Sequence, residues 1–230
     1  VAYYSVGVQV RVESAKILSD QFHNELFSSA PVAWRTAGYA IAEVTNRWQC
    51  DPRWSFFSLK NDLKTGKPAV LWSKELYPGD VTVELFVANK MEQERGRPYT
   101  YARDINVSIC SDGQDLTKGY TCMFGGFGNR GTYMFRNGLE VKKVAQTVIP
   151  TDMNFHRHWF YIRVEKRGNR ISYRVDRYFN GEPEGEWVFE DPFPVQGNRL
   201  AIWTYYHAVM ISRIRISCEG GGNWERPDRE

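Results

Sequence analysis

Aromatic rings and planar polar groups recur at a spacing of two residues in two segments of this chain. Trp203 and Tyr205 form one such pair, and Asp104 and Asn106 form another. A spacing of two places both side chains on the same face of a β-strand. Sugar recognition needs an aromatic surface for the C–H side of the ring and planar polar groups for the hydroxyls. We therefore predict that these four side chains contact a glycan.

Other candidate contacts fall in loops or at the ends of predicted strands. The complete predicted ligand-binding set is Trp54, Arg103, Asp104, Asn106, Asn129, Arg130, Trp203, Tyr205 and His207. Each residue also has a local alternative. Trp203 can fill a sheet face that a loop covers, and Arg130 can be a solvated turn residue. If Trp203 is a ligand contact, its replacement by alanine should abolish glycan binding without unfolding the domain.

Three further patterns favour structural roles. His156 and His158 share the spacing of some metal sites, but they lie in a predicted loop that leads into a strand. The glycine-rich run at 125–131 precedes a strand, so it lacks the helix N-terminus that phosphate binding uses, and it predicts a β corner with positive φ. Asp112 and Asp115 can supply oxygens to Ca²⁺, but an Asx turn is the favoured interpretation. No catalytic residue is predicted.

Charge and hydropathy exclude two classes of partner. The 230 residues include 30 basic and 27 acidic ones, a net charge of +3. This balance lacks the basic footprint of a nucleic-acid-binding protein. No apolar run reaches about 18 residues, so no membrane insertion is predicted. The chain has no initiator Met or signal peptide and opens directly into a strand-like pattern, so we expect an excised part of a longer polypeptide.

Short alternating segments dominate the chain, and turn signals recur roughly every 8–15 residues. Val81, Val83, Leu85 and Val87 alternate with polar positions, and Asn137-Gly138 is a strong hairpin signal. No long stretch has helical periodicity. These features predict an all-β fold, an antiparallel two-sheet β-sandwich of jelly-roll type. We expect one domain over residues 1–218 and a flexible tail or linker over 219–230.

Four cysteines, Cys50, Cys110, Cys122 and Cys218, have no metal-type spacing. Cys110 and Cys122 end and begin consecutive predicted strands. A disulfide across that hairpin would indicate an oxidising compartment. The alternative is that all four are buried free thiols.

Several segments together resemble the concanavalin A-like lectin/glucanase superfamily over about residues 17–218. They include "LWSKELYPGDVTVEL", "GYTCMFGGFGNRGTYMFRNG", "HWFYIRVEKRGNRISYRVD" and "EDPFPVQGNRLAIWT". More narrowly, the chain resembles LamG-like domains in large secreted or surface proteins of planctomycete-type bacteria. The superfamily contains lectins, carbohydrate-binding modules, adhesion domains, β-glucanases and polysaccharide lyases. The resemblance therefore implies a fold without assigning an activity.

The resemblance also suggests where an enzyme of this fold would carry its catalytic groups. Retaining β-glucanases need two carboxylates about 5–5.5 Å apart. The best matching segment here, "DINVSIC", offers Asp104, Asn106 and Ser108 but no glutamate. A lyase is a second alternative, in which Arg103, His207, Tyr205 and Tyr206 come together for proton abstraction if their strands are neighbours. Both enzyme classes remain alternatives to a non-catalytic role.

Calcium is common in this superfamily, and Asp20 matches the position of its first metal-binding aspartate. Ser212 stands where many relatives have an acidic residue. The resemblance therefore implies a structural Ca²⁺ near Asp20, although the second acidic residue is missing.

The preferred interpretation is a non-catalytic carbohydrate-binding or adhesion module that binds a glycan or polysaccharide on the concave sheet face. We expect it to belong to a larger secreted or surface protein, at an extracellular, cell-surface or periplasmic location. The alternatives are a glycoside hydrolase or polysaccharide lyase of the same fold, and a structural domain whose aromatic face contacts another protein.

Overall fold

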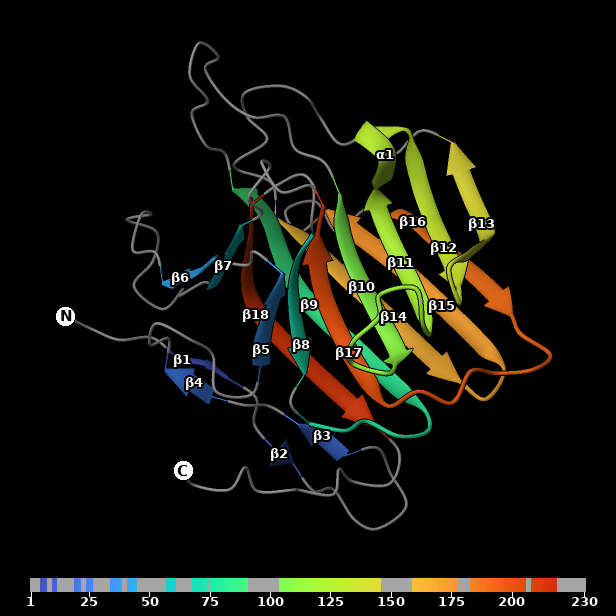
Figure 1. The fold of residues 1–230 in the computed structure, drawn as a ribbon, viewed down its shortest axis with the longest axis horizontal. Coiled ribbons are helices and arrows are strands. Elements are labelled where there is room, and N and C mark those ends of the chain that lie inside the picture. Colours follow the sequence, from blue (N-terminus) through green and yellow to red (C-terminus); the bar gives the residue numbers. More distant parts are fainter. Residues whose placement is uncertain are drawn as a thin grey trace.

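The computed structural model describes thirteen stretches of the chain. They are residues 5–7, 10–11, 19–21, 24–26, 34–38, 41–44, 57–60, 68–73, 75–90, 104–145, 159–177, 183–205 and 208–218. Most of these residues lie in β-strands (Figure 1). The predicted tail, residues 219–230, falls outside them, and the assignment of 1–218 to one domain remains a prediction. In the described part of the chain, no helix has the length and apolarity to cross a membrane.

One sheet has seven antiparallel strands. In spatial order they are β13 (Leu139–Ala145), β12 (Gly131–Arg136), β11 (Tyr120–Gly125), β10 (Ile105–Ser111), β17 (Arg199–Thr204), β8 (Ala69–Ser73) and β5 (Trp34–Gly38). A single irregular turn, α1 (Gly126–Asn129), joins β11 to β12.

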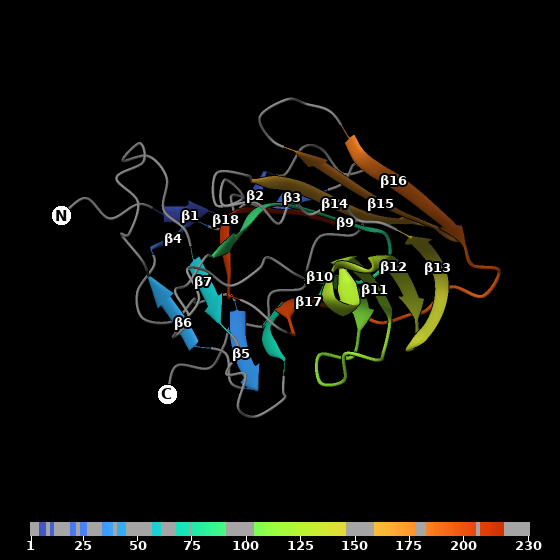
Figure 2. The ribbon, with the colours of Figure 1, turned by 90° about the horizontal axis from the view of Figure 1, so that it is seen from above.

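The second sheet has nine strands. Its main order is β16 (Pro183–Glu190), β15 (Arg170–Arg177), β14 (Phe160–Arg167), β9 (Val81–Lys90), β18 (Ala208–Cys218), β3 (Ser19–Gln21) and β2 (Val10–Arg11). β7 (Phe57–Lys60) pairs with β18 and with β6 (Ile41–Val44). A separate pair consists of β1 (Ser5–Gly7) and β4 (Asn24–Leu26). Seen from above, the two large sheets form two facing layers, which confirms the predicted antiparallel β-sandwich (Figure 2).

Alternation along the strands builds the core between these layers. Val81, Val83, Leu85 and Val87 of β9 are each at most 1% exposed, as their period of two predicts. On β14, Phe160, Ile162 and Val164 also point inward. Burying each such side chain stabilises the fold by roughly 1.5–3 kcal/mol. The core therefore depends on residues from both sheets.

The hairpin at Asn137-Gly138 forms as predicted between β12 and β13. Both residues have positive φ, 45° and 77°. A two-residue turn of type I′ requires this conformation, and Asn-Gly adopts it readily.

The predicted alternatives for Cys110 and Cys122 were a disulfide across the hairpin and buried free thiols, and the structure shows the second. Cys110 and Cys122 are buried free thiols, so no disulfide joins them, and Cys218 is buried as well. The register explains why, because Cys122 lies opposite Val107 and not opposite Cys110. Burial raises the pKa of the Cys110 thiol to about 12, which keeps it protonated and unreactive. Cys50 lies outside the described residues.

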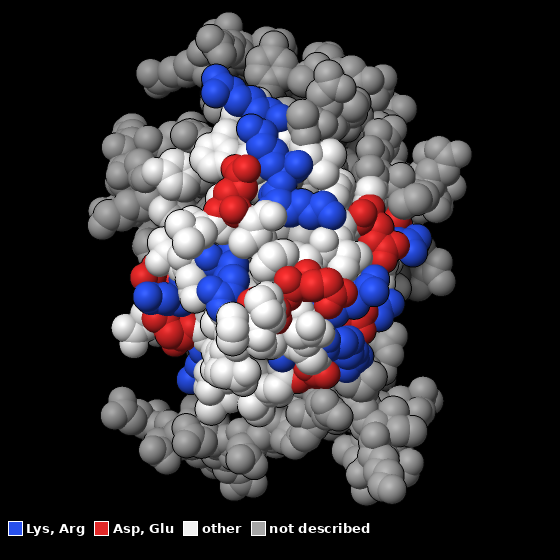
Figure 3. All heavy atoms as spheres, turned by 90° about the vertical axis from the view of Figure 1, so that its right-hand side faces the viewer, with Lys and Arg blue, Asp and Glu red and all other residues white. Residues whose placement is uncertain are grey.

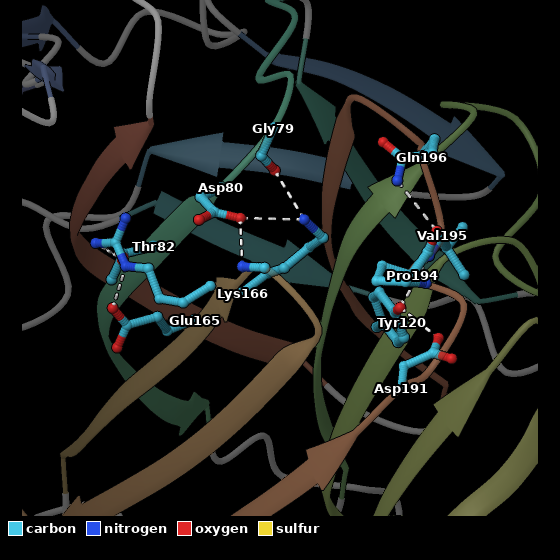
Figure 4. Close-up of polar contacts among 12 residues, drawn as sticks. Gly79, Asp80, Thr82, Tyr120, Glu165, Lys166, Asp191, Pro194, Val195 and Gln196 are labelled. Carbon is cyan, nitrogen blue, oxygen red and sulfur yellow. Dashed lines mark hydrogen bonds and ion pairs between the residues drawn. The ribbon is translucent and has the colours of Figure 1, made fainter.

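Two polar clusters close one end of the sandwich (Figure 4). In the first, Lys166 Nζ lies 3.2 Å from Asp80 Oδ1, and the amide of Gly168 donates to the same oxygen at 2.8 Å. This cluster links β14 and the turn after it to the segment just before β9.

The second cluster centres on Asp191. Tyr120 Oη donates to Asp191 Oδ2 at 2.6 Å, and Arg136 Nε donates to it at 2.5 Å. The Val195 amide donates to Tyr120 Oη at 2.9 Å. The loop that carries the chain from β16 to β17 is therefore fastened to β11 and β12.

Candidate functional site

The outer face of the seven-stranded sheet carries a row of large side chains. The row runs across five strands, from Tyr133 through Met123, Asn106 and Trp203 to Val70, and each member lies opposite the next in register. A second row beside it contains Thr121, Ser108, Ala201 and Trp72. We call the first set the outer-face row. Its residues lie on the face that points away from the core between the sheets.

Trp203 sits at the centre of this face, but its ring is not exposed as the sequence suggested. Only 7% of its surface is accessible, and its Nε1–H donates to Ser108 Oγ at 3.0 Å. Val70, Trp72 and Ala201 belong to the same apolar cluster. Replacing Trp203 with alanine would therefore remove packing as well as any ligand contact.

Asp104 and Asn106 form a buried pair beside Trp203, with 1% and 0% of their surfaces exposed. Asn106 Nδ2 donates to Asp104 Oδ2 at 2.6 Å, and the amide of Tyr205 donates to the same oxygen at 2.6 Å. Thr204 Oγ1 donates to the Asp104 carbonyl oxygen at 3.0 Å. These bonds join the start of β10 to the end of β17.

One polar atom in this pair is left over. Asn106 Oδ1 is buried and, within the part of the chain that the structure describes, has no hydrogen-bond partner. Because a carboxylate only accepts, the amide nitrogen of Asn106 must face Asp104, and the amide oxygen must face the other way. A buried acceptor without a partner is costly, and it is normally satisfied by water or by a ligand. Asn106 Oδ1 can therefore accept a hydrogen bond from water or from a ligand hydroxyl that reaches it.

The α1 turn adds aromatic surface at the same end of the sheet (Figure 1). Ile105 of β10 pairs with Phe124 of β11. Continuing this antiparallel register by one residue places Asp104 opposite Gly125, the residue before α1. Phe127 in this turn is 54% exposed. Its ring packs edge-on against Tyr133 at a centroid distance of 5.0 Å. Tyr133 in turn stacks on Phe135 at 5.9 Å, so three rings meet beside the outer-face row.

Glycines allow this turn to lie close to the sheet. A side chain at Gly126 would place its Cβ only 2.2 Å from Met123 Sδ. Gly125, Phe127 and Gly128 have φ values of 69°, 52° and 75°, which confirms the predicted corner with positive φ. The turn thus lies against Met123 at a distance that suits glycine at position 126, and it carries the exposed Phe127.

The structure brings part of the predicted ligand-binding set to this end of the sheet. Asp104, Asn106, Trp203 and the 37% exposed Tyr205 are neighbours there. Asn129 is the last residue of α1, and the exposed Arg130 follows it. Trp54, Arg103 and His207 lie outside the described residues, as do His156 and His158.

Sequence reasoning missed the aromatic group of Phe127, Tyr133 and Phe135. Tyr133 and Phe135 share a spacing of two, the same signal that identified Trp203 and Tyr205. Phe127 carried a signal as well, because a large residue between glycines in a β corner has little reason to be there for packing.

The metal-site predictions have no described ligand set. Asp20 on β3 lies opposite Ser217 and Arg11, which brings no second carboxylate. Within the described ranges, no three His, Cys, Asp or Glu side chains come together as a metal site would require. The loop 112–119 contains Asx turns, as favoured: Asp112 Oδ1 accepts from two following amides at 2.8 Å.

Comparison with known proteins gives matches of fold. No protein-family model and no curated protein sequence matches the chain. Among solved structures, peanut lectin in complex with a 9-residue peptide superposes with a TM-score of 0.58 and 10% identity, over 89% of this chain and 97% of that one. The VIP36 exoplasmic/lumenal domain, in its Ca²⁺/Man2-bound form, gives a TM-score of 0.54 and 10% identity, over 87% of each chain.

A third match is the lectin UEA-II in complex with galactose, with a TM-score of 0.52 and 6% identity, over 86% of this chain and 96% of that one. At such low identity these matches speak for architecture and not for activity. The chain therefore has the concanavalin A-like β-sandwich fold that these lectins share.

Proposed function

We propose that this chain is a non-catalytic carbohydrate-binding module. Its glycan binds at the α1 end of the outer face of the seven-stranded sheet. The observation that carries this proposal is Asn106 Oδ1, an acceptor without a partner among the described residues, in the middle of the outer-face row. A sugar hydroxyl is a donor of the required kind, and it comes attached to a C–H surface that packs on aromatic rings.

Each neighbouring group has a role in this proposal. Tyr205 and Phe127 provide exposed rings for the sugar, while the buried Trp203 lies beside Asn106 in the outer-face row. Asp104 orients the Asn106 amide and so fixes which atom faces the ligand. Arg130 is exposed at the end of α1, and its guanidinium supplies hydrogen-bond donors to the ligand.

The structural neighbours support a sugar ligand. UEA-II was solved with galactose and the VIP36 domain with mannose-type ligands, and both share this fold. The enzyme alternative has less support from the described residues. On strands β10 and β11 the outward positions hold Asn106, Ser108, Thr121 and Met123, so no pair of carboxylates is available there for glycoside hydrolysis.

We further propose that the module belongs to a larger secreted, surface or periplasmic protein, as LamG-like domains do. The VIP36 neighbour is itself an exoplasmic/lumenal domain, which supports such a location. The proposal does not depend on calcium at Asp20, whose side-chain surroundings lie outside the described part of the chain.

A glycan array on the purified chain tests the proposal, with and without calcium, followed by calorimetry on each hit. We expect reversible binding that Asn106→Leu abolishes. The matched control is Ser172→Ala on the other sheet, which should bind like the wild type. Circular dichroism must show that both variants are folded. Failure of every glycan to bind, or full binding by a folded Asn106→Leu variant, would refute the proposed site.

Reducing-sugar release and absorbance at the wavelength of unsaturated uronates test the enzyme alternative on the same hits. Product formation would make the chain an enzyme and would end the non-catalytic proposal.

A further inference from the structure

We propose that the glycan bound at this site is acidic, with a uronate or sulfate group held by Arg130 and Lys143. The inference rests on the proposed carbohydrate-binding function and specifies the ligand class of the same site. It comes from the charges that surround the exposed ring of Phe127.

Phe127 is held in a backbone conformation that phenylalanine rarely adopts. Its φ is 52° and its ψ is 44°, in the left-handed region that costs free energy for any residue with a Cβ. Its ring is nevertheless 54% exposed, so core packing does not explain the choice of residue. A Cβ at Gly128 would meet no atom within 4 Å, which means that the turn faces open space. Strain at an exposed residue is typical of ligand-binding segments.

Two cations lie near the turn that carries this ring. Lys143 lies opposite Tyr133 in the register of β12 and β13, and its Nζ is 5.5 Å from the centroid of the Tyr133 ring. Phe127 packs on that same tyrosine. Arg130 is exposed and directly follows α1, and among the described residues its guanidinium has no hydrogen bond or ion pair. Lys143 thus borders the aromatic group of Phe127, Tyr133 and Phe135, and Arg130 lies at the end of the turn that carries Phe127.

Little negative charge opposes them. Glu140 lies opposite Phe135 and is exposed, and Asp104 is buried with an oxygen that already accepts two hydrogen bonds. Lys142 adds a third cation on β13, although its Nζ donates to the Val188 carbonyl at 3.1 Å. From the β13 and β16 side, a band of basic side chains runs across the upper part of the described surface with acidic groups beside it, and basic and acidic side chains are mixed below it (Figure 3).

This arrangement suits an acidic sugar better than a neutral one. The C–H face of a sugar packs on Phe127, and a carboxylate or sulfate then forms charge-assisted hydrogen bonds with Arg130 and Lys143. A neutral sugar would leave both cations without an anionic partner.

Binding of acidic and neutral polysaccharides to the wild-type chain tests the inference. Polygalacturonate and heparin serve as acidic probes, and mannan and galactan serve as neutral ones. We expect the acidic probes to bind more tightly, and we expect the preference to shrink at high salt, where the Debye length falls from about 10 Å at 0.1 M to about 3 Å at 1 M.

Variants separate a built site from general attraction to a basic protein. Arg130→Gln combined with Lys143→Gln should weaken acidic-glycan binding about tenfold or more, the usual effect of losing hydrogen bonds to charged groups. The matched control is Arg170→Gln, which removes an exposed cation at the turn between β14 and β15 and should leave binding unchanged.

Three results would overturn the inference, and they differ in what they say of the proposed function. Tight binding of neutral glycans that the double variant does not weaken would refute the acidic ligand and keep the carbohydrate-binding function. An equal loss in Arg170→Gln would show attraction to net charge alone and would refute the site. Absence of binding to every polysaccharide would refute both.

Discussion

The two sheets present opposite kinds of outer face. Along the seven-stranded sheet the outward side chains are mainly aromatic, apolar or uncharged polar groups, and most are buried. Along the nine-stranded sheet they are charged and partly exposed: Arg163 and Arg167 both pair with Glu165, and Arg174 pairs with Asp176. Both faces arise from the same period-two alternation. The identity of the outward residues, and not the alternation, therefore marks the functional face.

The charged face needs no ligand to explain it. Its arginines and carboxylates lie 2.7–3.0 Å apart in pairs, although Arg163 Nε has no hydrogen-bond partner among the described residues. Tyr161 donates to Glu84 and packs on Phe86 at 5.3 Å, which adds a further local contact. Exposed pairs of this kind contribute little to stability, typically about 0–1 kcal/mol. The face resembles an ordinary solvated surface, in contrast with the largely buried aromatic and apolar outer face of the other sheet.

The largest expected effect comes from the centre of the aromatic face. Trp203→Ala should destabilise the fold by about 3–5 kcal/mol, because it empties a buried site and leaves Ser108 without its indole donor. Arg174→Gln on the charged face should change stability little. Urea unfolding of both variants checks this contrast. Equal stability of the two variants would mean that Trp203 is not part of a packed layer.

A second test uses pH. Burial acts to raise the pKa of Asp191, but hydrogen bonds from Tyr120, Arg136 and the Phe193 amide outweigh it and lower the pKa below its usual value. Because the folded pKa lies below the unfolded one, Asp191 stabilises the fold above about pH 4, and this contribution is lost as the pH falls through the folded pKa. Asp191→Asn should destabilise the protein by about 1–3 kcal/mol at neutral pH and flatten this acid dependence. Thermal melts from pH 3 to pH 7 measure the stability of the wild type and of Asp191→Asn. If the melting temperatures of both proteins fall in parallel as the pH is lowered, the prediction is wrong.

A third test separates binding from stability at Phe127. Phe127→Gly relieves left-handed strain of about 1–2 kcal/mol, and it loses ring contacts of about 0.5–1.5 kcal/mol per pair. The melting temperature should therefore change little, while glycan affinity should fall. Calorimetry of binding and of unfolding on the same sample measures both. A large loss of stability would show that Phe127 is a packing residue.

The smallest effects are expected on the charged face. Glu165→Gln removes the partner of two arginines there, and it should shift stability by less than about 0.5 kcal/mol, as is usual for exposed substitutions. Glycan binding should match that of the wild type. Reduced binding by this variant would place the ligand on the nine-stranded sheet and reverse the comparison.

The sequence predicted the fold better than the site. The alternation of Val81 to Val87 and the Asn137-Gly138 turn depend on local rules, so they could be read directly. Which outward face is aromatic and which is charged could also be read from the strands. The burial of Trp203 could not, because a face that points away from the core can still be covered, and coverage depends on chain segments far apart in sequence.

The geometry of the Asp104 pair was equally hidden. Spacing suggested that Asp104 and Asn106 share a face, but only the structure shows that one amide atom is engaged and the other is not. The joining of Asp104 to the Tyr205 amide depends on the pairing of β10 with β17, which is a long-range contact. Local sequence patterns carry no record of such pairings.

The contact between Lys142 and Val188 has a consequence for solubility. β13 and β16 are the last strands of their sheets, and both lie on the same side of the molecule (Figure 2). Free strand edges are templates on which a second chain can add and begin to aggregate. The Lys142 ammonium crosses from one edge to the other and occupies a backbone carbonyl that an incoming strand would need. An incoming strand would have to displace this charged group. Lys142 therefore protects the end of the sandwich, where β13 and β16 are the edge strands, against the addition of a further strand.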